Sequence, residues 1–111
     1  MTKFTITDHE AAAQAASGLP AAARAYGSRI AAAAAPLQGL NDCHAPAEVL
    51  DALAQSRRLL TRAARADAQI MLLLRDAGAS PRGIADRLGM HHTTVVKLIE
   101  AAEAERVGEV S

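Results

Sequence analysis

The chain has 111 residues, enough for one modest domain, and its formal net charge is zero. Cys43 is its single cysteine, which excludes an intrachain disulfide and leaves an exposed or packed thiol. The first residues lack an apolar signal core, and the alanine run 31–35 is too short to cross a bilayer. We therefore expect a cytoplasmic protein without membrane contact.

Large apolar side chains are unevenly distributed. Twenty-eight residues are alanine, and of the Ile, Leu, Val, Met, Phe and Tyr residues, eight lie in 1–48 and seventeen in 49–99. Segment 1–45 has too little apolar volume for a core of its own. We predict that it is a helical docking or dimerisation region, followed by a second region over 46–111. The high content of alanine and arginine is typical of a GC-rich bacterial source.

The N-terminal segment reads as a short arm and two helices. Residues 1–7 alternate polar and apolar side chains, which indicates a short strand, an extended arm or a disordered terminus. A first helix is predicted over 8–17 and ends at Gly18, and Pro20 begins a second one over 20–35. Residues at spacings of three and four predict its packing stripe: Leu19, Ala23, Tyr26, Ile30, Ala33 and Leu37.

A loop over 37–45 leads into a segment without glycine or proline, residues 47–77. Its residues favour helix, so we predict one long or slightly bent helix. Two helices, divided near Asp67, are the alternative. The expected packing positions of this segment are Val49, Leu53, Ser56, Leu60, Ala63, Asp67, Ile70, Leu74 and Ala77.

Residues 80–100 predict two helices around a tight corner. Ser80 is a good N-cap, and Pro81 stands at the first helical position, where its missing N–H has no cost. Ile84 and Leu88 share one helical face, and Gly89 suits the left-handed residue that ends a helix. The second helix is expected over about 91–103, with core positions at Val95, Leu98 and Ile99.

This order of residues resembles the helix-turn-helix DNA-binding motif. Ile84, Ala85, Leu88, Gly89, Met90, Val95 and Leu98 match the positions that hold its two helices together. The likeness is to the three-helix unit of resolvases and invertases, of some transposases and of the last region of sigma factors, and it covers roughly 67–102. It implies an all-α fold in which a C-terminal three-helix unit follows alanine-rich helices.

In such a motif the second helix enters the major groove of the DNA. The resemblance puts His91, His92, Thr93 and Lys97 at positions that contact bases or phosphates, although histidine is a poorer cap than the serine usual at the first of them. Ser80, Arg82 and Thr94 are expected near phosphates. Exposed surface without contact is the alternative for the two histidines.

The charge distribution is consistent with this interpretation. Residues 56–98 carry eight basic and three acidic side chains, although the whole chain is neutral. Arg57, Arg58, Arg62 and Arg65 cluster on the predicted long helix, as a backbone-contacting patch or as a solvated face. Glu103 and Glu105 are expected to be solvated or paired with arginine.

We therefore expect a small transcriptional regulator that binds double-stranded operator DNA as a homodimer. The sequence offers no nucleophile constellation, phosphate loop or metal cluster, so we predict no catalysis, cofactor, metal or small-molecule ligand. The alternative function is a helical module that uses the same shape to bind polymerase or a partner regulator.

Overall fold

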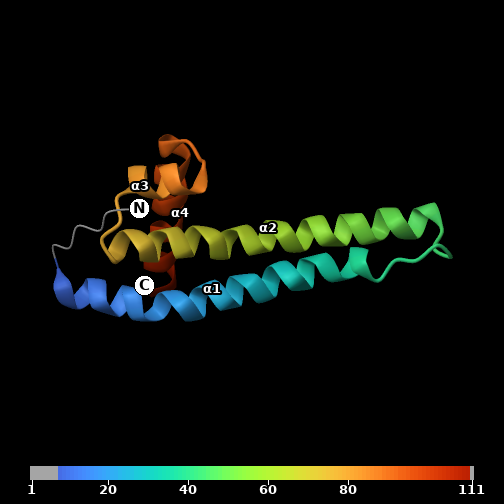
Figure 1. The fold of residues 1–111 in the computed structure, drawn as a ribbon, viewed down its shortest axis with the longest axis horizontal. Coiled ribbons are helices and arrows are strands. Elements are labelled where there is room, and N and C mark those ends of the chain that lie inside the picture. Colours follow the sequence, from blue (N-terminus) through green and yellow to red (C-terminus); the bar gives the residue numbers. More distant parts are fainter. Residues whose placement is uncertain (1–7, 111) are drawn as a thin grey trace.

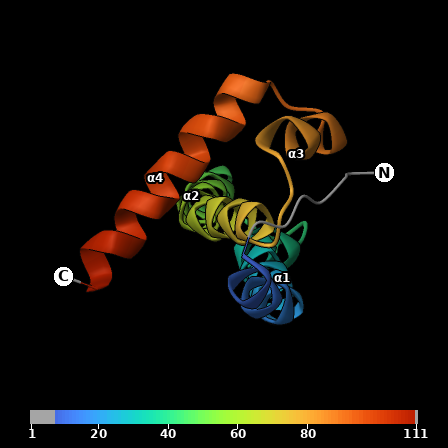
Figure 2. The same ribbon diagram turned by 90° about the vertical axis from the view of Figure 1, so that its left-hand side faces the viewer.

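The computed structural model describes residues 8–110, which form four helices and no strand. Helices α1 (His9–Gln38) and α2 (Pro46–Asp76) form a long antiparallel hairpin (Figure 1). Helices α3 (Pro81–Leu88) and α4 (His92–Val110) gather around the last turns of α2. Viewed along the hairpin, α4 crosses α2 obliquely, with α3 beside its N-terminal end (Figure 2).

The all-α class, the long central helix and the C-terminal helix-turn-helix are thus confirmed. The segment 1–7, for which we expected a strand or an arm, lies outside the described residues. A membrane-spanning helix is absent from the part of the chain that the structure describes.

The first helix corrects the prediction of two helices over 8–17 and 20–35. Asp8 caps α1 by accepting a hydrogen bond from the Ala11 amide at 3.1 Å, but the helix then continues through Gly18, Pro20 and Pro36. An interior proline removes a backbone hydrogen bond and costs about 3 kcal/mol. Packing along the whole of α2 offsets this cost, because buried or half-buried residues recur on both sides of the proline: Ala12, Ala15, Leu19, Ala22, Tyr26 and Ala33.

The second helix settles the choice between one helix and two, since α2 runs unbroken from Pro46 to Asp76. Ala77 is its C-cap, and Gly78 follows with a φ of 114°, which glycine adopts without strain. The Gly78 and Ala79 amides donate to the carbonyls of Arg75 and Leu74. This ending turns the chain sharply toward α3.

The line of contact between the two long helices, here called the seam, follows the predicted stripes only in part: the predicted positions Ala33, Ser56 and Ala63 are buried in it. On α2 it follows Ala52, Ser56 and Ala63, and the Ser56 hydroxyl donates to the Ala33 carbonyl at 2.5 Å. These small residues are four and seven residues apart on one face of α2, which lets the helices approach closely. Six predicted stripe residues are each more than a third exposed: Ala23, Ile30, Leu37, Val49, Leu53 and Leu60.

The largest core lies where α2, α3 and α4 meet. It is formed by Ala68, Met71, Leu72, Ala79, Ile84, Ala85, Val95, Ile99 and Ala102, with Leu74, Met90 and Leu98 packed against it. Leu88, predicted to join this core, is 50% exposed. It occupies the last turn of an eight-residue helix, beyond the buried pair Ile84 and Ala85.

Candidate nucleic-acid interface

Both ends of α3 have the local chemistry that the sequence predicts. The Ser80 hydroxyl accepts a hydrogen bond from the Gly83 amide at 3.0 Å, and Pro81 follows at the first helical position. Gly89 is left-handed at φ 68°, and its amide donates to the carbonyls of Ala85 and Asp86. A side chain there would be strained, so glycine fixes the direction in which the chain leaves α3.

Helix α4 is held by its inner face. Val95 is completely buried, and Ile99 and Ala102 follow it at spacings of four and three. Met90 fills the corner, where its amide donates to the Ala85 carbonyl at 2.9 Å. The opposite face of the first two turns is left to solvent.

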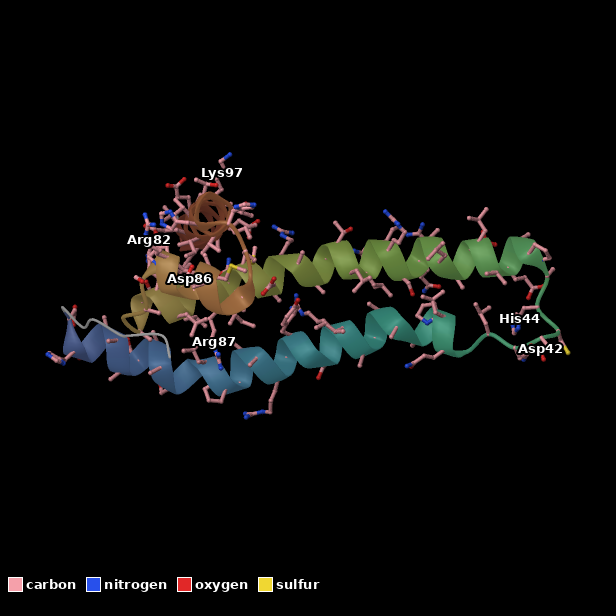
Figure 3. The ribbon with its side chains drawn as sticks, turned by 45° about the horizontal axis from the view of Figure 1, so that its top comes forward. Asp42, His44, Arg82, Asp86, Arg87 and Lys97 are labelled. Carbon is pink, nitrogen blue, oxygen red and sulfur yellow. The ribbon has the colours of Figure 1, made fainter. Side chains whose placement is uncertain are left out.

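The predicted contact residues of α4 fall on or beside this outer face. Thr93, Thr94 and Lys97 are exposed, and Lys97 extends away from the hairpin in Figure 3. His91 is also exposed but precedes the helix, and its carbonyl accepts from the amides of Thr94 and Val95. His92 is half-buried and begins α4. The helix runs to Val110, past the predicted end near 103.

The predicted residues of α3 lie close to the same end of the molecule. Arg82 is exposed in the first turn, and Ser80 is exposed although its hydroxyl already serves as the cap. Figure 3 shows Arg82 and Lys97 projecting from neighbouring helices of the unit.

One residue of the outer face was missed by the sequence analysis. Glu100 is exposed and lies three residues after Lys97, on the same side of α4. The spacing of Thr93, Lys97 and Glu100 was the available signal. A carboxylate here is repelled by phosphate, but it can accept a hydrogen bond from the amino group of cytosine.

Several arginines near the three-helix unit form ion pairs with acidic residues of the same chain. Arg65, one of the four clustered arginines, binds Glu105 at 3.0 Å while its side chain stays largely exposed. Arg75 binds Glu103 at 2.6 Å and Asp76 at 3.1 Å, and Arg106 binds Asp76 at 2.8 Å. Glu103 and Glu105 are thus paired with arginine, one of the two outcomes expected.

The pairs of Arg65 with Glu105, Arg75 with Glu103 and Arg106 with Asp76 fasten the second half of α4 to α2. The side-chain amide of Gln69 adds a hydrogen bond to the Ala102 carbonyl at 3.2 Å. Desolvation alone would raise the pKa of Asp76, but the hydrogen bonds and charges of Arg106 and Arg75 outweigh it and lower the pKa. Desolvation alone would lower the pKa of Arg75, and its bonds to Glu103 and Asp76 raise it. Both charged forms are favoured.

Comparison with known proteins agrees with this geometry. A family model described as a homeodomain-like domain matches residues 56–108, just under half of the chain. The match begins within α2 and includes α3 and most of α4. Neither the curated proteins nor the solved structures contain a significant match. Residues 56–108 are thus similar to the homeodomain-like domain, which supports a helix-turn-helix DNA-binding unit in this part of the chain.

Proposed function

We propose that this protein is a small, non-catalytic transcriptional regulator of the bacterial cytoplasm that binds a specific operator as a dimer. Residues 80–100 would act in the manner of the resolvase, invertase and sigma-factor motifs that they resemble. The first two turns of α4 enter the major groove. Thr93, Lys97 and Glu100 meet base edges, while Ser80, Arg82 and Thr94 lie near phosphates.

One observation carries this proposal most directly. The outer face of α4 is exposed at Thr93, Thr94 and Lys97, while Val95 and Ile99 hold the same helix firmly from behind. A convex helix anchored in this way can be inserted into a groove about 12 Å wide without unfolding its support.

The nearby charges favour a nucleic acid over an apolar partner. Arg82, Arg87 and Lys97 are exposed on α3 and α4 and, among the residues described, outnumber the exposed acidic residues there, Asp86 and Glu100. Glu103 and Glu105 are bound to arginines on the side facing α2. Lysine and arginine side chains at this surface attract the phosphate backbone.

Charge reversal tests the proposal. We expect Lys97→Glu to weaken binding to a selected duplex by tenfold or more, since a base contact contributes about 1–3 kcal/mol. The combined Arg82→Glu, His92→Glu and Lys97→Glu variant should lose DNA binding at an unchanged helical content. Fluorescence anisotropy with labelled duplex measures affinity, and circular dichroism measures helicity.

Arg24→Glu is the matched control, because Arg24 is exposed on α1, in the hairpin rather than in the three-helix unit, and the change in net charge is the same. The wild-type affinity should also fall steeply with salt, by about one unit of log–log slope for each phosphate contact. Equal effects of Lys97→Glu and Arg24→Glu would contradict a specific α4 contact. Capture of polymerase or another regulator without any affinity for DNA would favour the protein-interaction module instead.

A further inference from the structure

The two flanks of the α1–α2 hairpin differ in chemistry. On one flank, grooves beside the seam are lined by polar side chains that include Arg29, Gln55, Arg65 and Gln69. The other flank carries four large apolar residues, here called the apolar flank: Ile30, Leu37, Leu53 and Leu60. Each of the four is 40–49% exposed.

The register of the hairpin brings these four residues to one side. The hydrogen bond from Ser56 to the Ala33 carbonyl sets Ile30 level with Leu60 and Leu37 level with Leu53. Leu53 follows the seam residue Ala52 by one position, and Leu60 lies seven residues further along the same face of α2. Ile30 and Leu37 are likewise seven residues apart on α1, and in an antiparallel pair of helices two such rows face each other across the same edge. The apolar flank is therefore continuous across both helices.

The positions of this register in the middle of the hairpin are uncharged: Ala23, Ile30, Leu37, Leu53 and Leu60. The next position, Asp67, lies close to the three-helix unit. The exposed Arg57 is the charged neighbour of Leu53 and Leu60 on α2, farther from the seam than either. An isologous contact sets a surface against its own copy, so any charge at its centre meets a like charge. The four uncharged side chains of the apolar flank avoid this repulsion at the centre of the contact, and Arg57 lies at its edge.

The chain is elongated and exposes more surface than a compact monomer of its size, which also favours association. Its accessible surface is 7795 Å², whereas a compact monomer of 11.5 kDa exposes about 5800 Å². Its radius of gyration is 17.2 Å, against about 13 Å for a compact domain of this length. A standard interface buries about 800 Å² on each partner. This area is smaller than the difference between the surface of this chain and that of a compact monomer.

We propose that the apolar flank is the dimer interface, on which a second copy of this chain packs to complete a four-helix bundle. The choice of a second copy rests on the proposed function, because a helix-turn-helix unit commonly reads DNA in pairs of half-sites. The proposal names which face of the hairpin associates and leaves the polar flank free in the dimer.

Sedimentation velocity of the full chain without DNA tests this assignment, from micromolar to submillimolar protein. Wild type should sediment as a dimer. Leu53→Glu and Leu60→Glu should each raise the dimer dissociation constant at least about a hundredfold, because each buries an unpaired carboxylate in both copies.

Gln55→Glu is the matched control. It introduces the same carboxylate two residues from Leu53 but on the polar flank, and it should sediment like wild type. Circular dichroism checks that helicity is retained. If Leu53→Glu loses helicity, Leu53→Gln and Leu60→Gln replace the acidic variants, since glutamine is a good helix former without charge. Wild type that stays monomeric throughout overturns the proposal, as do folded flank variants that dimerise normally.

Duplex titration of the same samples separates this proposal from the proposed function. If wild type is dimeric and the flank variants are monomeric, but none of them binds any duplex, the interface is supported and the DNA-binding role is contradicted. If wild type is monomeric, and wild type and the flank variants bind DNA with equal affinity, the interface is contradicted and the DNA-binding role is supported.

Discussion

At the scale of single residues, Asp76 joins the two halves of the structure. Its carboxylate accepts from Arg75 on α2 at 3.1 Å and from Arg106 on α4 at 2.8 Å, while Arg75 also binds Glu103. Asp76 is about three-quarters buried, so these bonds are less screened than surface ion pairs. The Asp76 carboxylate thus helps to hold α4 in the orientation that exposes Lys97, although it does not contact Lys97 itself.

We expect Asp76→Asn to reduce the free energy of unfolding by about 1–3 kcal/mol at neutral pH, since bonds to charged groups are lost. The pKa of Asp76 is lowered in the folded protein, so its contribution is complete above the unfolded pKa of about 3.9. It is lost as the pH falls through the lower, folded pKa. Urea denaturation of both proteins at several pH values measures this difference.

Asp51→Asn serves as the control, because Asp51 is exposed on the same helix. Asp67 acts in the opposite direction, since desolvation raises its pKa and its ionised form is disfavoured. Comparing Asp76→Asn with wild type cancels that effect, because Asp67 is present in both. A stability difference that stayed constant down to the lowest pH would show that the ion pairs of Asp76 do not support the fold.

At the scale of the helices, the sequence was most informative where signals are local. Ser80, Pro81 and Gly89 each act on the backbone beside them, so the ends of α3 could be predicted within a residue. The burial of Val95 and Ile99 likewise follows from their spacing on one helix. The contact residues of α4 were predicted through the same spacing and through resemblance, and they stay predictions until DNA binding is measured.

The hairpin was harder to predict for a physical reason. Nearly half of α1 is alanine, so its apolar pattern has little contrast. The predicted stripe included Ala33, which is buried, but also the large residues Ile30 and Leu37, which are exposed. The close contact of Ala33 with Ser56 is a tertiary feature that spacing within one helix does not contain. The same tertiary packing carries α1 through Pro20, which local rules read as the start of a new helix.

We expect Pro20→Ala to stabilise the protein by about 1–2 kcal/mol, raising the melting temperature by several degrees. Alanine restores an amide donor within α1 and relieves the clash of the ring with the preceding turn. The greater freedom of the unfolded chain offsets part of this gain. Thermal unfolding followed by circular dichroism gives the measurement.

Pro46→Ala is the paired control, because Pro46 is the first residue of α2, where a proline fits the helix without losing a bond. That change should be neutral or slightly destabilising. If Pro20→Ala destabilised the protein and Pro46→Ala did not, α1 would be broken at Pro20 in solution, as the local sequence predicted.

At the scale of the whole molecule, α2 belongs to two structures at once. Its seam residues Ala52, Ser56 and Ala63 pair with α1, while Ala68, Met71 and Leu72 form the core with α3 and α4. A helix is stiff over this length, so the three-helix unit is held in a fixed direction relative to the apolar flank. Two copies joined at that flank would therefore present their α4 helices in a fixed, two-fold related arrangement.

A two-fold symmetric dimer should select DNA sites that have the same symmetry. We expect wild type to enrich inverted repeats from random duplexes, with one constant separation between half-sites, because a rigid dimer permits a single spacing. Leu53→Glu should enrich single half-sites of the same sequence with weaker affinity, since its α4 is unchanged while its partner is lost. Lys97→Glu should dimerise normally but fail to enrich that sequence. Sequencing the selected pools measures all three, and direct repeats or variable spacing from wild type would contradict a two-fold dimer built on the hairpin.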